Sequence, residues 1–439
     1  MSFSQNKLVL IAGGLVIVTI ILVTIIFLSR GFGGGDVGQR ADIQFWGVYD
    51  SSNSFRQSIS GYQLKNPQVQ IEYREFNFED YEKALINAFA SGQGPDIFMV
   101  QNTWLSRYFD KISPLPQQIP DRKELLLTLK SFREQFVDVA EKDLVVGGEI
   151  YSLPLYVDTL ALYYNKDILN SLGITRPPQT WGEFNEIVEK VTVVDANNNV
   201  SRAGASIGTA RNVNRSTDIL SLLMLQSGVP MVDDAGLSAD FSKIIDGNDL
   251  GQVALEYYTD FSNPAKRVYT WNDDLHYSID AFQEGTAAMM FNYSHQIPLL
   301  RSKAPRLNFG ISAMPQLDAS PVLNYANYWA LTVSKFSPAG RQAWDFLVYL
   351  SSTEGVLPYL NMTSRPTARR DLIEQQKNDL DLGVFAKQAL TAGSWYQVDS
   401  VVIENILADT IEDVNFGRRS IAEALRTAEN KITLLMQRR

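Results

Sequence analysis

The sequence contains no cysteine among its 439 residues. This absence excludes disulfide bonds, thiolate metal sites, cysteine nucleophiles and a lipid-modified cysteine as a membrane anchor. It does not identify the redox compartment, because a protein of this size needs no covalent cross-links in either environment.

Histidine and net positive charge are also scarce. The two histidines, His276 and His295, have no second histidine or carboxylate at the spacing of a metal site. The formal net charge is -10 and no cluster of basic residues lies among aromatic ones, so we expect no nucleic-acid partner. No glycine-rich loop follows a strand and opens a helix, as a phosphate site requires. The sequence therefore predicts neither a metal site nor a cofactor.

The sequence contains the residues of one catalytic motif but lacks the structural pattern that this motif requires. Residues Gly204 to Gly208 have the form G-x-S-x-G, but a nucleophile elbow needs an apolar helix after the serine. Residues 209–215 carry no helical apolar face, so we interpret this segment as a strand that leads into a loop. With 49 acidic residues, a pair of carboxylates that hydrolyses glycosidic bonds stays an open alternative.

One long apolar run is present near the amino terminus. Residues 8–28 contain no charge and, at 1.5 Å per residue, would span ~30 Å as a helix, the thickness of a bilayer core. No small-residue cleavage site follows. We predict an uncleaved transmembrane anchor at 8–28 in the cell membrane, followed by a flexible glycine-rich tether at 29–40. The flanking charges leave the membrane orientation undecided.

The globular part is organised around residues 90–104. Gly94 and Pro95 end a helical pattern, and residues 97–100 form a short apolar run without alternation, which is typical of a strand buried on both faces. Gln101 to Trp104 follow directly, with side chains that hydrogen-bond or stack. Because ligands bind outside the carboxyl ends of strands in open α/β sheets, we expect a binding site here. A simple turn of the chain would explain the same residues.

Strand and helix patterns alternate along the chain, for example at 43–47, 55–64 and 68–76. This alternation predicts βαβ units and a mostly parallel sheet. The length exceeds that of a single core and favours two or more lobes. Capping boxes at Thr180 to Glu183 and Ser420 to Glu423 mark the starts of two helices.

A second apolar stretch, residues 150–164, contains Asp158. A carboxylate in such a run is costly unless it has partners. Asp158 either caps a turn or projects with Tyr156 into a cleft where the chain passes between lobes.

Several short stretches resemble the family 1 extracellular solute-binding proteins of ABC importers, a group that includes maltodextrin-binding proteins. The stretches that carry the resemblance occur in the order Gly94–Ile97, Leu160–Asp167, Thr180–Phe184, Phe282–Met290 and Tyr328–Ser334. They are short, and the resemblance that they carry in this order extends over nearly all of residues 41–439. The resemblance implies an α/β, two-lobed periplasmic-binding-protein-like fold with mostly parallel sheets and three crossings between lobes, expected near 155–160, 311–316 and 362–368.

These crossings would divide the chain into two lobes. Lobe 1 would contain 41–157 with about 314–362, and lobe 2 would contain 158–313 with about 363–439. The resemblance also implies a ligand cleft, whose residues would be Trp46, Asp50, Gln101, Asn102, Tyr156, Asp158, Asn292, His295, Asn327, Tyr328, Trp395 and Tyr396.

A sugar is the ligand that such residues would suit. Aromatic rings cover the C–H faces of a sugar, while Asp, Asn and Gln satisfy its hydroxyl groups. We expect Trp46, Tyr156, Tyr328 and Trp395 to be the stacking platforms, although each could equally be a core residue. Two departures from the family matter: many relatives have Trp near His295, and many carry a lipid-modified Cys where this chain has its apolar run.

The resemblance implies a monomeric, membrane-tethered and non-catalytic receptor, with its globular part outside the cytoplasm. It would capture a sugar or oligosaccharide and deliver it to the permease of an ABC importer. Two alternatives stay open, an extracytoplasmic carbohydrate hydrolase and a ligand-sensing ectodomain.

Overall fold

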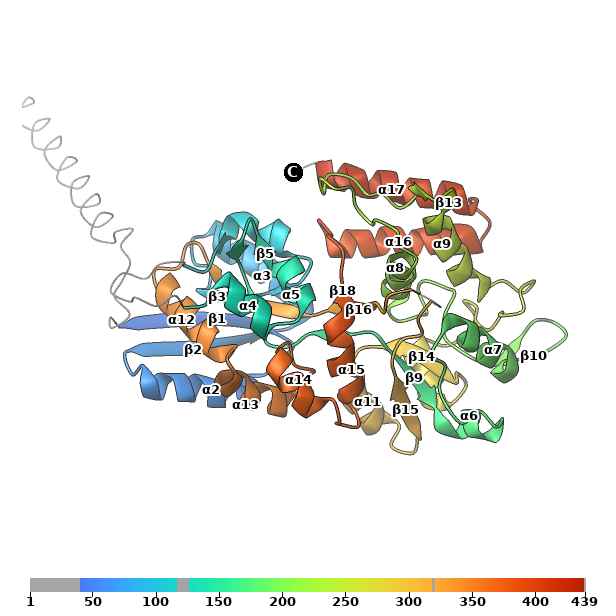
Figure 1. Ribbon diagram of the computed structural model, residues 1–439, viewed down its shortest axis with the longest axis horizontal. Coiled ribbons are helices and arrows are strands. Elements are labelled where there is room, and N and C mark those ends of the chain that lie inside the picture. The colour runs from blue at the N-terminus through green and yellow to red at the C-terminus, as the bar shows by residue number, and fades with distance from the viewer. Residues whose placement is uncertain (1–39, 117–125, 318–319, 438–439) are drawn as a thin grey trace, which may run out of the picture.

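The computed structural model describes residues 40–116, 126–317 and 320–437. Figure 1 shows two lobes side by side, joined at the centre by segments that run from one to the other. The predicted anchor at 8–28 and the tether up to residue 39 lie outside the described residues. Within the described ranges, no helix has the length and apolar character needed to cross a bilayer.

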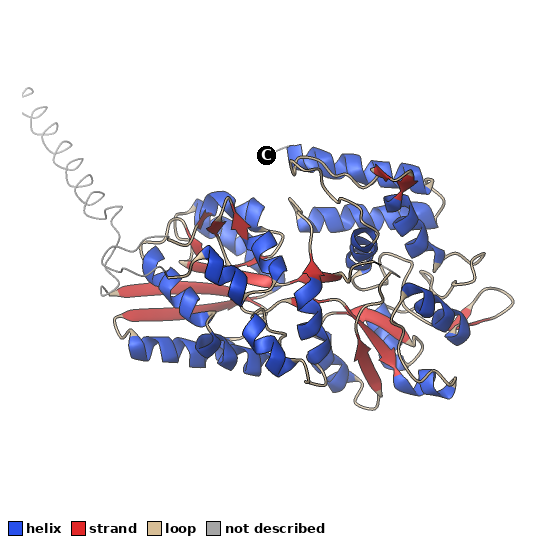
Figure 2. Cartoon of the chain, viewed as in Figure 1, coloured by secondary structure: helices blue, strands red, loops and turns tan. Residues whose placement is uncertain are grey.

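The first lobe contains a six-stranded sheet with the order β2-β1-β3-β17-β4, in which β7 also pairs with β17. The strands are β1 (Ala41–Val48), β2 (Val69–Phe76), β3 (Ile97–Gln101), β4 (Ile112–Ser113), β7 (Leu153–Pro154) and β17 (Trp329–Ser334). Helices flank the sheet (Figure 2), and α2 and α13 pack together. The helical elements are α2 (Ser52–Lys65), α3 (Phe78–Ala90), η1 (Leu105–Lys111), α4 (Leu129–Gln135), α5 (Asp138–Leu144), α12 (Gly340–Leu350), α13 (Thr353–Thr363) and α14 (Arg370–Gln376).

The second lobe contains the three-stranded sheet β14-β9-β15, formed by Met289–Asn292, Ala161–Asn165 and Phe309–Ser312. Both faces of this sheet are buried. Leu162 packs in one hydrophobic cluster, and its neighbours Ala161 and Tyr163 pack in another on the opposite face. The helices of this lobe are α6 (Lys166–Ser171), α7 (Trp181–Val191), α8 (Ser216–Gln226), α9 (Leu250–Asp260), α10 (Ser278–Glu284), α11 (Gln296–Lys303), α16 (Ser400–Asn415) and α17 (Ile421–Gln437).

Short hairpins decorate both lobes. They are β5 (Val145–Val146) with β6 (Glu149–Ile150), β10 (Val193–Val194) with β11 (Val200–Arg202), and β12 (Ile244–Ile245) with β13 (Asn248–Asp249).

The prediction of mostly parallel sheets is wrong. Only β2, β1 and β3 run parallel in the first lobe, because β17 arrives from the second lobe and lies antiparallel to β3. In the second lobe, β14 and β15 are both antiparallel to β9. The physical reason is that β3, β14 and β17 are mostly apolar and buried on both faces, so their residue pattern is the same whichever way the strand points.

Two large hydrophobic cores show where the chain changes lobe. Val157 packs in the first core and Leu160 in the second, so the chain passes to the second lobe between them. Tyr325 packs in the second core and Ala326 in the first, so the chain returns there. Ala389 packs in the first core and Trp395 in the second, so the chain passes to the second lobe again between them. At these places the strands β8 (Asp158–Thr159), β16 (Asn324–Asn327) and β18 (Ala392–Gly393) pair in one small sheet, which we call the hinge sheet. The hinge sheet lies between the lobes (Figure 1).

The first crossing lies where it was predicted, but the other two do not. Met314 packs in the second core, so the second crossing is at β16 rather than at 311–316. Leu372 and Ile373 of α14 pack in the first core, so the third crossing is at β18 rather than at 362–368. The crossing strands are short and partly polar, and thus carry no apolar pattern. Helix α15 (Gly383–Gln388) and η2 (Ala389–Thr391) lead into β18.

Both predicted capping boxes are present. The Thr180 side chain accepts a hydrogen bond from the Glu183 N–H and starts α7. The Ser420 hydroxyl accepts from the Glu423 N–H while the Glu423 carboxylate accepts from the Ser420 N–H, at the start of α17. The capping patterns in the sequence therefore predicted correctly where these two helices begin.

Candidate functional site

A cavity of about 670 Å³ lies between the two lobes. It is formed by the ends of β1, β3 and β17, by the amino-terminal parts of α8 and α16, and by residues of the hinge strands β8 and β16. Small-molecule sites have volumes of roughly 300–1,000 Å³, so the cavity is large enough for a sugar-sized ligand.

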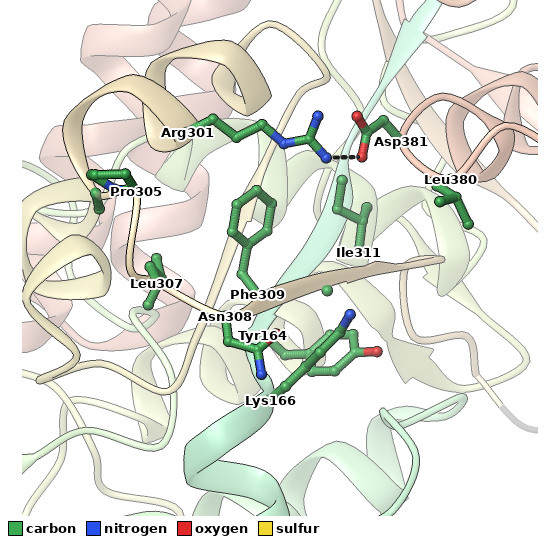
Figure 3. A pocket seen from close by; sticks show the side chains of 12 residues that line it. Tyr164, Lys166, Arg301, Pro305, Leu307, Asn308, Phe309, Ile311, Leu380 and Asp381 are labelled. Carbon is green, nitrogen blue, oxygen red and sulfur yellow. Dashed lines mark hydrogen bonds and ion pairs between the residues drawn. The ribbon is translucent and has the colours of Figure 1, made fainter.

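A second cavity, of about 530 Å³, lies beside β15 in the second lobe (Figure 3). The ion pair between Arg301 and Asp381, 2.6 Å long, lies at its edge, and Lys166 and Phe309 also line it. None of the predicted site residues lines this cavity. The interlobe cavity is therefore the candidate ligand site.

Half of the predicted site residues line the interlobe cavity, namely Gln101, Asn102, Tyr156, Asp158, His295 and Asn327. The Gln101 amide donates to the Asn327 side-chain oxygen at 3.2 Å and so joins the end of β3 to the hinge sheet. The Ser400 hydroxyl donates to Gln101 from the start of α16, also at 3.2 Å. This contact connects the two lobes at the cavity.

Three of the expected stacking platforms do not line the cavity. Trp46 packs in the first core against Phe76, with a ring-centre distance of 4.6 Å. Tyr328 is fully buried, and its hydroxyl donates to Asp143 at 2.9 Å. Trp395 lies in the second core. The structure places these aromatic residues in packing roles.

The other three predicted residues also lie outside the cavity lining, but two of them contact residues that line it. Asp50 accepts a hydrogen bond of 2.8 Å from Arg365, and Asn292 donates to Asn214 at 3.0 Å. Tyr396 is partly exposed and does not line the cavity.

An aromatic wall that the sequence interpretation missed lines the first-lobe side of the cavity. It consists of Tyr49, Phe78 and Trp329. Tyr49 and Phe78 stack with ring centres 5.6 Å apart, and Trp329 meets Tyr49 edge-on at 5.8 Å. Tyr49 is 56% exposed although it is a large aromatic residue. The wall therefore offers aromatic surface to a ligand.

Local geometry explains the position of the wall. Trp329 lies opposite Gln101 in the register of β17 and β3, so both residues reach the same end of the sheet. Tyr49 follows β1 with φ of 68°, in the left-handed region that residues other than glycine rarely adopt. Such backbone strain is concentrated at functional sites. The place of Tyr49 directly after the first strand was the signal in the sequence that could have found it.

Two arginines that the sequence interpretation also missed line the cavity. Arg365 donates to Asp50 and lies 4.3 Å from the ring centre of Tyr156. Arg215 lies 5.3 Å from the ring centre of Tyr293. In both arginines the Nε atom is buried and has no hydrogen-bond partner among the described residues. Leaving a buried donor unpaired costs about 1–3 kcal/mol, so both atoms are candidates for ligand contacts.

The cavity carboxylates lie in poorly solvated surroundings. Burial raises the pKa of Asp158 to about 6, although its side chain accepts hydrogen bonds from Ser294 and Thr159. Burial also raises the pKa of Asp218, which accepts a 2.8 Å bond from Tyr293. Glu404, from α16, has its pKa raised by burial and then by Asp218. Protonation of these groups is therefore easier than in water.

His295 is neutral at physiological pH. Removal from water lowers its pKa, and the positive charges of Arg215 and Arg365 lower it further. Its ring stacks on Tyr293 with a centre distance of 6.1 Å. Neutral histidine offers one hydrogen-bond donor and one acceptor to a ligand.

Neither serine chemistry nor a metal cluster is visible in the described residues. Ser206 of the G-x-S-x-G segment is buried beside Met289, and the next helix begins only at Ser216. No group of three or more His, Asp or Glu side chains in the described ranges is placed to hold a metal ion. The cavity combines one aromatic wall with polar groups from both lobes, which is an arrangement for binding.

Comparisons with known proteins agree with this geometry. The family model for bacterial extracellular solute-binding proteins matches residues 57–381. A protein of Brucella abortus (strain 2308) that is named as a binding protein is 20% identical over 404 residues, covering 88% of this chain and 90% of that protein. Maltodextrin-binding protein MdxE of Bacillus subtilis (strain 168) is 24% identical, covering 79% and 78% of the two chains. The crystal structure of cyclic alpha-maltosyl-1,6-maltose binding protein from Arthrobacter globiformis has a TM-score of 0.74 at 18% identity, covering 91% of this chain and 100% of that chain.

Proposed function

Because the chain belongs to the family of bacterial extracellular solute-binding proteins, we propose that it captures a sugar or oligosaccharide between its lobes for an ABC importer. Relatives are named for binding maltodextrin or cyclic alpha-maltosyl-1,6-maltose. We extend to this chain the chemical class of those ligands, carbohydrate, and no particular sugar.

The observation that carries the proposal is the aromatic wall of Tyr49, Phe78 and Trp329 in a cavity of sugar-binding size. A sugar ring has a C–H face that packs on aromatic rings and hydroxyl groups that need hydrogen-bond partners. Such partners are supplied by Gln101 beside the wall, by Asn327 of the hinge sheet and by His295 of the second lobe. A ligand held there contacts both lobes at once.

The lobes would move relative to each other at the hinge sheet. Its three strands are two to four residues long and carry the described crossings between the cores. A few residues at the ends of elements are enough to absorb hinge motion in two-lobed proteins. Ligand contacts to both sides of the cavity would then favour a closed form, which the importer permease would recognise.

A thermal-shift screen with neutral and acidic mono- and oligosaccharides tests the proposal. A ligand that binds only the folded state raises the melting temperature, by an amount that grows with its concentration. We expect at least one sugar to raise it while chromatography recovers the sugar intact. If no sugar shifts the melting temperature at millimolar concentration, the proposal fails.

The same chromatography addresses the hydrolase alternative. Asp218 and Glu404 place two carboxylates in the cavity, but the family and its relatives are binding proteins. Conversion of an oligosaccharide to shorter products by purified protein would favour hydrolysis. A ligand-sensing ectodomain would instead bind sugar without supporting uptake by an importer.

We also propose that residues 8–28 anchor the protein and place its lobes outside the cytoplasm as a monomer. The uncharged apolar run supports this part of the proposal. Fractionation tests it: the full chain should sediment with membranes, whereas a chain that lacks residues 1–39 should stay in the supernatant.

A further inference from the structure

Two arginines from different parts of the chain line the same cavity. Arg365 follows α13, on the first-lobe side of the hinge, and Arg215 directly precedes α8 in the second lobe. Arg215 has φ of 64° and Ser364, next to Arg365, has φ of 50°. Arg215 is thus in the left-handed region itself, whereas Arg365 follows a left-handed residue that ends α13.

Each arginine is held by an aromatic ring and a carboxylate of the protein, and each keeps a free donor. Arg365 packs on Tyr156 and donates to Asp50, which does not line the cavity. Arg215 packs on Tyr293, and its nearest carboxylate oxygen, on Asp218, is 3.9 Å away. The Nε atoms of both arginines are buried without a partner among the described residues. A guanidinium presents donors in a fork that matches the two oxygens of a carboxylate.

Two other side chains that line the same cavity, His295 and Tyr49, are each influenced by both arginines. The charges of Arg215 and Arg365 both act on His295 from the second lobe, where they lower its pKa after removal from water. Both also act on Tyr49 from the first lobe, where burial raises its pKa, the two arginines lower it and Glu79 raises it. Tyr49, His295 and the two arginines all line the cavity, and the two guanidinium groups form what we call the arginine subsite.

Two of the cavity carboxylates accept hydrogen bonds from other side chains and from the backbone of the protein. Asp158 accepts from Ser294 and Thr159, and Asp218 accepts from Tyr293. Glu404 is influenced by Asp218, Arg215 and Arg211. Asp218 and Glu404 lie on α8 and α16, whereas Asp158 lies on the hinge strand β8, where the charge of Arg365 lowers its pKa against the effect of burial.

We propose that this subsite binds a carboxylate of the guest, so that the preferred ligand is an acidic sugar, a uronic acid or an oligosaccharide that contains one. The inference rests on the proposed function, since the aromatic wall would cover the sugar ring while the arginines from both lobes hold its carboxylate. A shared anion would also draw the lobes together.

Calorimetric titration of the full-length protein with galacturonate and glucuronate, against galactose, glucose and glucose 6-phosphate, tests the proposal. We expect at least one uronate to bind about tenfold or more tightly than its neutral parent, as charge-assisted hydrogen bonds imply. The preference should shrink as salt is raised. Oligosaccharides of the same two classes extend the panel if single sugars bind too weakly to measure.

Variants of Arg215 distinguish the loss of its charge from a loss of folding. Arg215→Gln should weaken uronate binding about tenfold and weaken binding of the neutral parent by a clearly smaller factor. Arg215→Lys, which keeps the charge without the fork, should weaken uronate binding less. Arg267→Gln removes an arginine that is 87% exposed and paired with Glu189, and should leave both affinities unchanged. The melting temperature without ligand shows whether each variant is folded.

The outcomes distinguish the inference from the proposed function. Equal or tighter binding of the neutral parent, or of the sugar phosphate, would overturn the acidic-sugar assignment and leave carbohydrate binding intact. Equal losses for uronate and neutral sugar in Arg215→Gln would overturn it as well. Failure of every sugar to bind would refute the proposed function itself.

Discussion

At the scale of single residues, whether a side chain lines the cavity depends on which residues surround it in the fold. Gln101 and Asn102 were predictable because they follow a buried apolar strand, and strand ends carry ligand sites. Trp329 was not, because the sequence shows adjacent Tyr328 and Trp329 but not which one faces the core. The two arginines were missed because Asp50, which pairs with Arg365, and Tyr293, on which Arg215 packs, are distant from them in sequence.

Tyr49→Ala tests the aromatic wall. Tyr49 is exposed to the cavity, so its loss should change the free energy of unfolding by no more than about 0.5 kcal/mol. Loss of ring stacking, about 0.5–1.5 kcal/mol, should weaken sugar binding several-fold, as measured by calorimetry. Tyr396→Ala is the matched control, since Tyr396 is partly exposed and lies outside the cavity lining. Unchanged affinity in Tyr49→Ala would remove Tyr49 from the site.

Asp158 makes a pH-dependent contribution to stability. Burial raises its pKa to about 6 from the usual value of 3.8, so the folded state holds this proton more tightly than the unfolded state does. The contribution is present below about pH 4 and is lost as the pH rises through about 6. The free energy of unfolding of the wild type should fall by about 3 kcal/mol relative to Asp158→Asn over that range. Urea unfolding at several pH values measures it, and parallel curves for the two proteins would contradict the assignment.

At the scale of elements, the sequence was informative where signals are local. Capping at Thr180 and Ser420 and the apolar run of β3 predicted elements that the structure contains. Strand direction and the later crossings were wrong, because β17 pairs with β3 across more than two hundred residues. Nothing in the local pattern of β16 or β18 shows that they belong to a hinge.

Asp143 of α5 connects several of these elements. Its carboxylate accepts hydrogen bonds from Asn102 after β3, from Tyr328 before β17 and from Ser394 after β18. Because an asparagine would place its NH₂ group against these donors, Asp143→Asn should lower the free energy of unfolding by about 1–3 kcal/mol.

The same substitution should also weaken sugar binding, because Asn102 lines the cavity. Chemical unfolding and calorimetry measure the two effects. Asp138→Asn, on the same helix with a side chain that is 82% exposed, is the control and should change neither quantity appreciably. A destabilised Asp143→Asn protein with full affinity would assign Asp143 to structure alone.

At the scale of the whole molecule, two cores are joined by three short strands, and we propose that the molecule closes on a ligand by motion at these strands. Exposed apolar residues from both lobes, among them Phe78 and Val401, line the same cavity and would be covered on closure. The length and the order of family stretches predicted two lobes from sequence, while the cavity itself required the register of strands that meet only in three dimensions. Closure around a guest is the central claim.

Energy transfer between two labelled positions tests that claim most directly. Because the chain has no cysteine, the substitutions Ile86→Cys and Leu434→Cys introduce the only thiols. Ile86 is 50% exposed on α3, Leu434 is 55% exposed on α17, and they report on the two lobes. We predict that transfer efficiency rises when a sugar that raises the melting temperature is added, and that Tyr49→Ala requires a higher sugar concentration for the same rise. Unchanged transfer at a saturating concentration of a sugar that binds would contradict the account.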